Sequence, residues 1–257
     1  MKISETGEKC PKCGAPIKRM GTYTIPCECE SKEKEEQEKN ALTIAENERR
    51  EKMRVFSGLS LRNVEQTFNF TANKNQEKAK KYCENWCNNY INNTLSKDRQ
   101  SIMLVGTVGS GKTHLASAIL NSIIDNHKIK INKETEILQT SIKSPYIFTT
   151  ALDMFLELSQ IYTKTVDAMQ TINKFKECKL LIIDDLGGEK TTDRSKEFLQ
   201  SIIDYRYSNY LPVIITTNLS ADELKMRYDE RTIDRLRDIC EFLTITGESN
   251  RGKKYPA

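Results

Sequence analysis

After Asp98, short apolar runs alternate with polar stretches of helical composition. This alternation is typical of a mostly parallel sheet with helices on its faces. The apolar runs predict five strands, at residues 102–105, 146–150, 180–184, 213–217 and 242–245. The stretches between them predict helices at 112–126, 151–162, 193–209 and 220–238. We therefore expect an α/β fold, with residues 128–144 as a polar insertion or long loop.

A further helix is predicted over residues 75–92, before the first strand. Its side chains Cys83, Trp86, Cys87 and Tyr90 recur at spacings of three and four, which places them on one helical face. Such a stripe favours packing against a core over a metal site, because no second pair of ligands lies nearby in sequence.

The amino-terminal part has a different pattern. Residues 31–54 are rich in Lys, Glu, Arg and Gln, with no Pro or Gly, and predict one long exposed helix. Its apolar stripe is weak, which favours a solvated spacer over the alternative, a partner-binding helix. We expect three regions: a small domain at 1–30, a charged helical linker or partner-binding region at 31–58, and a larger domain at 59–257.

Composition narrows the class of protein. Of the 257 residues, 37% are apolar and 30% are charged, which suits a soluble protein with one well-covered core. No apolar run approaches the roughly 20 residues that span a bilayer, and residues 1–7 do not resemble a secretory signal. We expect a cytoplasmic protein without a membrane partner. The net charge of +4 neither requires nor excludes nucleic acid.

Residues 106–113 match the pattern G-x-x-x-x-G-K-[ST], after a predicted strand and at the start of a predicted helix. Glycines let the backbone N–H groups and the positive end of the helix face a phosphate. Lys112 should reach the β and γ phosphates of ATP, and the Thr113 hydroxyl should bind Mg²⁺. The predicted nucleotide-binding residues here are Gly106, Thr107, Gly109, Ser110, Gly111, Lys112, Thr113 and His114.

Polar side chains follow two other predicted strands. Asp184 and Asp185 end one of them, and ligands bind at the carboxyl ends of parallel strands. We predict Asp184 as a second Mg²⁺ ligand and Asp185 as the acid that orients or deprotonates the attacking water, although its side chain is one methylene shorter than the Glu often found there. Asn218 ends the other strand and is predicted to lie near the γ-phosphate and that water; helix capping is the alternative role.

Four of the eight cysteines lie before residue 30, as Cys10-x₂-Cys13 and Cys27-x-Cys29. In a reducing compartment such a cluster indicates metal ligands sooner than disulfides, and four thiolates complete a tetrahedral Zn²⁺ site. Unrelated reduced thiols or an iron centre are the alternatives. Because these residues lack a hydrophobic core, metal binding would supply most of their folding energy.

Five motifs together resemble the DnaC/DnaI helicase loaders and their IstB-like relatives, which are AAA+ ATPases. They are residues 106–113, 180–187, 214–220, 230–236 and 247–251, in that order, and the resemblance covers residues 60–257. It implies that Arg235 is the arginine finger that enters a neighbouring subunit's ATP site, with Arg231 and Arg237 as alternatives on the same helix. It also implies that Arg251 contacts the nucleotide of its own subunit.

The resemblance implies a homo-oligomeric ATPase that loads a replicative hexameric helicase onto single-stranded DNA. In DnaI-type loaders an amino-terminal zinc domain contacts the helicase, so residues 1–58 are expected to dock it. An IstB-like helper of a transposase is the main alternative; a small-molecule kinase and an ATP-binding switch are less favoured. Direct contact with DNA is left open, since Lys128, Lys130, Lys133 and Lys143 alternate with acids.

Overall fold

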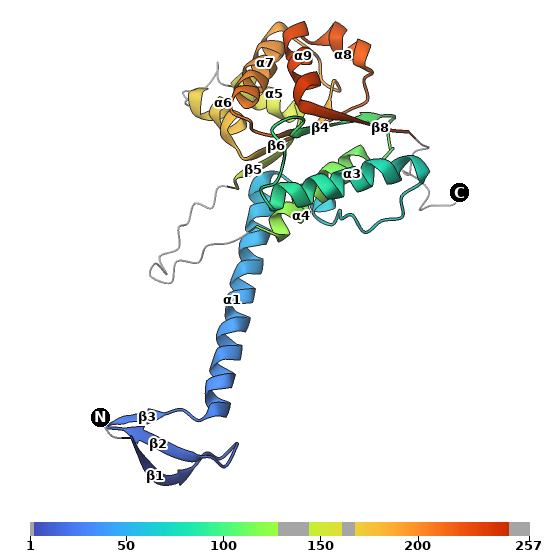
Figure 1. Ribbon diagram of the computed structural model, residues 1–257. Coiled ribbons are helices and arrows are strands. Elements are labelled where there is room, and N and C mark those ends of the chain that lie inside the picture. Colours follow the sequence, from blue (N-terminus) through green and yellow to red (C-terminus); the bar gives the residue numbers. More distant parts are fainter. Residues whose placement is uncertain (1–2, 128–143, 161–167, 247–257) are drawn as a thin grey trace. The chain divides into compact units, whose positions relative to one another are not determined.

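The computed structural model describes residues 3–127, 144–160 and 168–246. The chain divides into two compact units, Met1–Glu51 and Lys52–Ala257 (Figure 1). Most of the predicted insertion at 128–144, with its four lysines, and Arg251 lie outside the described residues. Among the helices of the described residues, none is both long and apolar enough to cross a membrane.

The first unit contains a small antiparallel sheet that the sequence pattern did not predict. Its strands are β1 (Ile3–Lys9), β2 (Pro16–Met20) and β3 (Tyr23–Ile25), with β2 in the middle. Most of their side chains are exposed, so the hydrophobic alternation that would reveal the strands is missing. Helix α1 (Glu28–Ser57) begins in this unit and confirms the predicted charged helix. The observed helix is three residues longer at each end than the predicted range of 31–54.

The second unit is built on a five-stranded parallel sheet in the order β5-β6-β7-β4-β8. The strands are β4 (Ser101–Gly106), β5 (Tyr146–Thr150), β6 (Leu180–Leu186), β7 (Val213–Thr217) and β8 (Cys240–Ile245). All five predicted strands are therefore confirmed, and so is the predicted α/β fold.

Helices cover both faces of this sheet. They are α2 (Leu61–Val64), α3 (Lys74–Ile91), α4 (Lys112–Asp125), α5 (Ala151–Ser159), α6 (Ala168–Glu177), α7 (Asp193–Ser208), α8 (Ala221–Arg227) and α9 (Glu230–Ile239). Helix α6 was not predicted. The single helix predicted at 220–238 was wrong: the chain leaves the helical conformation at Tyr228, whose backbone is extended and whose side chain is buried.

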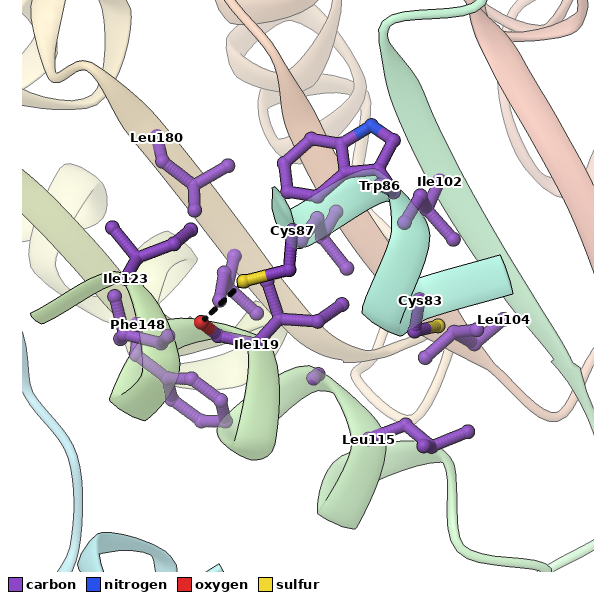
Figure 2. Packing of buried hydrophobic residues seen from close by; sticks show 14 of the residues in the cluster. Cys83, Trp86, Cys87, Ile102, Leu104, Leu115, Ile119, Ile123, Phe148 and Leu180 are labelled. Atoms are coloured by element: carbon purple, nitrogen blue, oxygen red, sulfur yellow. Dashed lines mark hydrogen bonds between the residues drawn. The ribbon is translucent and has the colours of Figure 1, made fainter. Parts of the chain in front are cut away.

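Two hydrophobic clusters pack on opposite faces of the sheet, because neighbouring residues of a strand point to opposite sides. Ile102 and Leu104 belong to the cluster with α3 and α4, whereas Met103 belongs to the cluster with α5 to α9. Figure 2 shows Cys83, Trp86 and Cys87 of α3 within the first cluster, as the stripe predicted. Burial raises the pKa of Cys83 to about 12, so its thiol stays protonated at neutral pH.

The carboxyl ends of the three central strands meet at one edge of the sheet. Val105 of β4 and Leu186 of β6 both align with Thr217 of β7. The pairing of β6 with β7 shifts between Ile183 and Leu186, where the two acidic residues lie. Such irregularities often lie next to active sites, because they redirect side chains out of the strand's regular pattern.

Candidate functional site

The phosphate loop, residues 106–113, connects β4 to α4, and two of its glycines are required by the local geometry. A Cβ at Gly106 would lie 1.9 Å from the carbonyl oxygen of Ile245, so only glycine fits beside β8. Gly111 caps α4 with a φ of +101°, in the left-handed region that glycine tolerates best. The loop therefore wraps tightly over the amino end of α4, where partial positive charge favours an anion.

Lys112 lies at the centre of this loop. Its buried Nζ donates hydrogen bonds to the carbonyl oxygens of Gly106 (2.9 Å) and Thr107 (2.8 Å) and to Asn218 Oδ1 (2.6 Å). The ammonium group is thus held between the loop and the end of β7, where a phosphate bound in the loop would meet it.

Asp184 lies beside Thr113, as the strand ends predicted. Its carboxylate accepts hydrogen bonds from Thr113 Oγ1 (2.9 Å) and from Thr216 Oγ1 (2.6 Å). Burial raises the pKa of Asp184, and the two hydroxyl donors oppose that shift only in part. A buried carboxylate next to a threonine hydroxyl suits a divalent cation with oxygen ligands.

Asp185 has a left-handed backbone, with a φ of +56°. Its N–H donates to Thr216 Oγ1 (2.9 Å) and leaves the strand ladder, which accounts for the local shift in register. Its carboxylate accepts a hydrogen bond from Asn218 Nδ2 (2.8 Å). Asn218 therefore joins Asp185 to Lys112, with its amide nitrogen toward the acid and its amide oxygen toward the lysine.

Five predicted site residues thus meet at one edge of the sheet: Lys112, Thr113, Asp184, Asp185 and Asn218. His114, also predicted to bind nucleotide, contacts protein instead. Its Nε2 lies 2.8 Å from the carbonyl oxygen of Thr67, and its ring packs edge-on against Phe70. Burial lowers the pKa of His114, so its ring is neutral and donates this hydrogen bond from Nε2.

The predicted arginine finger lies on α9, apart from these five residues. Arg235 pairs with Asp204 of α7 and lies over the ring of Tyr207, while Arg231 is 3.6 Å from the same carboxylate. Arg237 is exposed on the same helix. To enter a neighbouring site, Arg235 has to exchange Asp204 for a phosphate.

The four predicted zinc ligands of the first unit lie together. The Sγ atoms of Cys10, Cys13, Cys27 and Cys29 all lie within 4.8 Å of one another. With Zn–S bonds of about 2.3 Å, a tetrahedral site has sulfurs about 3.8 Å apart. The backbone N–H groups of Cys13 and Lys12 lower the pKa of Cys10 to about 6, whereas the neighbouring thiols Cys27 and Cys13 raise the pKa of Cys29, so the thiols titrate as a coupled group. Both the spacing and the donor set fit a structural zinc ion.

Two residues of the site were missed by the sequence patterns. The Thr216 hydroxyl donates a hydrogen bond to the Asp184 carboxylate and accepts one from the Asp185 N–H. Its position one residue before the end of a predicted strand could have indicated a place in the site. Gln76 of α3 donates from Nε2 to the carbonyl oxygen of Ser110 (2.8 Å), across 34 residues. Only its role in the helix cap, the Asn73-x-x-Gln76 capping box, could be read from the sequence.

The chain is similar to known proteins over most of its length. The family described as IstB-like ATP binding protein matches residues 37–256. YqaM of Bacillus subtilis (strain 168) is 31% identical over 153 residues, which are 57% of this chain and 43% of YqaM. The replicative helicase loader DnaC of Buchnera aphidicola is 30% identical over 159 residues, 62% of this chain and 59% of that protein.

A crystal structure of the DnaC helicase loader superposes with a TM-score of 0.58 at 24% identity, covering 72% of this chain and 99% of that one. This likeness concerns the fold. The chain spans about half the length of the curated relatives that it matches. Because the family match covers most of the chain, and the fold and the phosphate loop agree with it, the chain belongs to the IstB-like ATP-binding family and has the AAA+ P-loop fold.

Proposed function

We propose that this protein hydrolyses ATP and uses it to load a replicative hexameric helicase onto single-stranded DNA. The observation that carries the proposal is the hydrogen-bonded group of Lys112, Thr113, Asp184, Asp185 and Asn218 at the sheet edge. Relatives named replicative helicase loaders support the choice of target.

The chain's own residues can bind the triphosphate. Backbone N–H groups of residues 107–113 surround the phosphates, and Lys112 neutralises the charge on the β and γ groups. Thr113 and Asp184 offer the paired oxygen ligands that Mg²⁺ prefers. When bound there, Mg²⁺ withdraws negative charge from the phosphate oxygens and so lowers the barrier to attack.

Asp185 and Asn218 carry out the hydrolytic step, Asp185 as the base and Asn218 as the residue that positions it. Asp185 accepts a proton from a water molecule, whose oxygen forms a bond to the γ-phosphorus while the bond to the β–γ bridging oxygen breaks, giving ADP and phosphate. Asn218 holds the Asp185 carboxylate through Nδ2. Arg235 of a neighbouring subunit and Arg251 of the same chain would stabilise the charge on the transferred group.

The partner contacts belong to the two units separately. We assign helicase docking to the zinc cluster and α1, and assembly around DNA to the ATPase unit. Truncation at Glu51 separates these roles without loss of core residues, since Met53, Arg54 and Ser57 are buried in the second unit.

The catalytic assignment is tested by the turnover of Asp185→Asn. Loss of the base should lower ATP hydrolysis about 100-fold and leave ATP binding intact. Asp193→Asn, at a fully exposed acid of α7, is the matched control and should change neither. Unchanged turnover in Asp185→Asn would refute the role of this acid.

The loader assignment is tested with the replicative helicase of the same genome. The full chain should capture that helicase and promote its binding to single-stranded circles with ATP, while a chain starting at Lys52 should not capture it. Strong binding to duplex DNA and to a transposase, with no capture of helicase, would instead favour the IstB-like helper role.

A further inference from the structure

The carbonyl groups on the outer side of the phosphate loop need hydrogen-bond donors. A loop that directs N–H groups inward at an anion must direct the carbonyl groups of the same peptides outward, because C=O and N–H are opposed in a trans peptide. The peptide between Ser110 and Gly111 lies at the start of α4, where Ser110 is buried. Its outward carbonyl therefore needs a donor from the protein.

Gln76 of α3 is that donor. Its side chain is buried, and its Nε2 lies 2.8 Å from the carbonyl oxygen of Ser110. The contact is close: a Cβ added to Gly111 would lie 3.3 Å from the same nitrogen.

The orientation of the Gln76 amide is fixed by its other end. Gln76 Oε1 accepts a hydrogen bond from the backbone N–H of Asn73 (3.0 Å), and Asn73 Oδ1 accepts one from the N–H of Gln76 (2.9 Å). Because the oxygen must face Asn73, the NH₂ group must face Ser110. The capping box of α3 thus holds a donor against the phosphate loop.

The conformation of Gly111 does not by itself fix the Ser110–Gly111 peptide. Gly111 lacks a side chain and tolerates φ of either sign, so rotation of this peptide meets little steric resistance. A rotated peptide would turn the carbonyl oxygen inward, toward the phosphate, and the N–H outward. The Gln76 hydrogen bond selects between the two orientations.

We propose that Gln76 is a positioning residue of the ATP site: by holding the Ser110 carbonyl outward, it directs the Gly111 N–H at the bound phosphate. The start of α3 is then part of the phosphate loop. This inference rests on the proposed ATP binding and adds a residue that lies thirty positions before the start of the loop.

The test is Gln76→Glu in the full chain. Glutamate keeps the oxygen that caps α3 but presents a second oxygen, and no donor, to the Ser110 carbonyl. We expect the Kd for ATP and the KM to rise about tenfold, the effect of one lost hydrogen bond, with kcat nearly unchanged. Gln76→Met, which has similar length, no charge and no donor, should weaken ATP binding in the same way.

Asn73→Ala is the matched control. It removes the side-chain cap of α3, which lowers stability, but keeps the backbone N–H that orients Gln76. Its Tm should fall, and its Kd for ATP should stay within about twofold of the wild type.

The outcomes separate this inference from the proposed function. Wild type that binds ATP, together with Gln76→Glu and Gln76→Met variants that bind it equally well, would overturn the role of Gln76 alone. Equal losses of affinity in Asn73→Ala and Gln76→Met would also overturn it, because helix stability would then be the cause. Wild type that binds no ATP would overturn both.

Discussion

At the scale of single residues, the buried carboxylate of Asp184 affects both the folding stability of the chain and the proposed binding of Mg²⁺. Burial raises its pKa, so ionisation at neutral pH destabilises the folded chain. Its hydrogen-bond partners are the hydroxyls of Thr113 and Thr216, which offset part of that cost. A site that holds Mg²⁺ needs the charged form of Asp184. The buried carboxylate therefore favours Mg²⁺ binding at the expense of the stability of the metal-free protein.

Asp184→Asn should therefore raise the Tm at pH 7 in the absence of nucleotide, while Mg²⁺-dependent ATP turnover falls at least tenfold. The amide oxygen can accept both threonine hydrogen bonds without carrying charge. Because the folded-state pKa is raised, the wild type loses stability as pH rises from below the unfolded pKa of about 4 through the folded value.

The Tm gain of Asp184→Asn should then vanish below about pH 4 and be largest near neutrality. Differential scanning calorimetry across this range measures it. Asp193→Asn, at an exposed position, serves as the control and should show no such pH dependence. A variant less stable than the wild type at pH 7 would contradict the prediction.

The residues of the site differ in how far the sequence could predict them. Lys112 and Thr113 lie in a local motif, and Asp184 and Asn218 end apolar strands, so their position at one edge follows from the rules of parallel sheets. Gln76 could not be placed, because its contact with Ser110 depends on how α3 packs beside α4.

At the scale of elements, the break between α8 and α9 is held by a buried acid. Glu189 accepts a hydrogen bond from the Tyr228 hydroxyl and another from the Gly187 N–H (2.9 Å). Arg227 binds the Glu189 carbonyl oxygen and Thr191 Oγ1. The segment after Asp185 is thus tied to the end of α8, just before α9, the helix that carries Arg235.

Tyr228→Phe should lower the free energy of unfolding by about 1–3 kcal/mol, because it leaves a buried carboxylate oxygen without its donor. Urea denaturation measures the change. Tyr207→Phe is the matched control: its hydroxyl binds Asp238 at an exposed site, so its loss should cost less than about 0.5 kcal/mol. Equal costs in the two variants would show that Glu189 does not depend on Tyr228.

The strands were easier to predict than the helix ends. The three central strands, β4, β6 and β7, are mostly buried apolar runs, since central strands of a parallel sheet are covered on both faces. The break at Tyr228 carries no Gly or Pro, and the hydrogen bond between the Tyr228 hydroxyl and the distant Glu189 could not be read from the local sequence. Strands β1 to β3 bury few side chains, so the cysteines, not hydrophobicity, indicate that domain.

At the scale of the whole molecule, the two units depend on different sources of stability. The second has two hydrophobic clusters, whereas the described part of the first has mostly exposed side chains around four thiols. We expect about one zinc ion per chain, and its removal should unfold residues 3–29 without loss of ATP turnover.

Elemental analysis and limited proteolysis check this prediction. Cys10→Ser with Cys27→Ser should lose the metal and become sensitive to protease before α1. Cys178→Ser lies outside the cluster and should keep the full zinc content. Metal-free protein that resists protease as well as the native protein would contradict it.

If subunits share the ATP site, as the proposed arginine finger requires, a separate prediction follows. Lys112→Ala and Arg235→Ala should each lower ATP turnover by a factor of about 1,000 or more. A mixture of the two variants should recover up to roughly a quarter of the wild-type turnover, because some interfaces then combine an intact phosphate loop with an intact arginine finger.

Lys112→Ala mixed with Asp185→Asn is the control for that experiment. Both changes damage the same subunit's half of the site, so every interface stays defective and no turnover should return. If Arg237→Ala rather than Arg235→Ala complements Lys112→Ala, the finger is Arg237.

The left-handed backbone at Asp185 limits which mutations can persist there. Aspartate and asparagine adopt a φ of +56° more readily than other residues with side chains, and glutamate does so less well. This geometry gives a reason for the shorter acid at this position. Asparagine is also one base change from aspartate in the genetic code, so a single base change can give a chain that folds and binds ATP but, under the proposed mechanism, is trapped before hydrolysis.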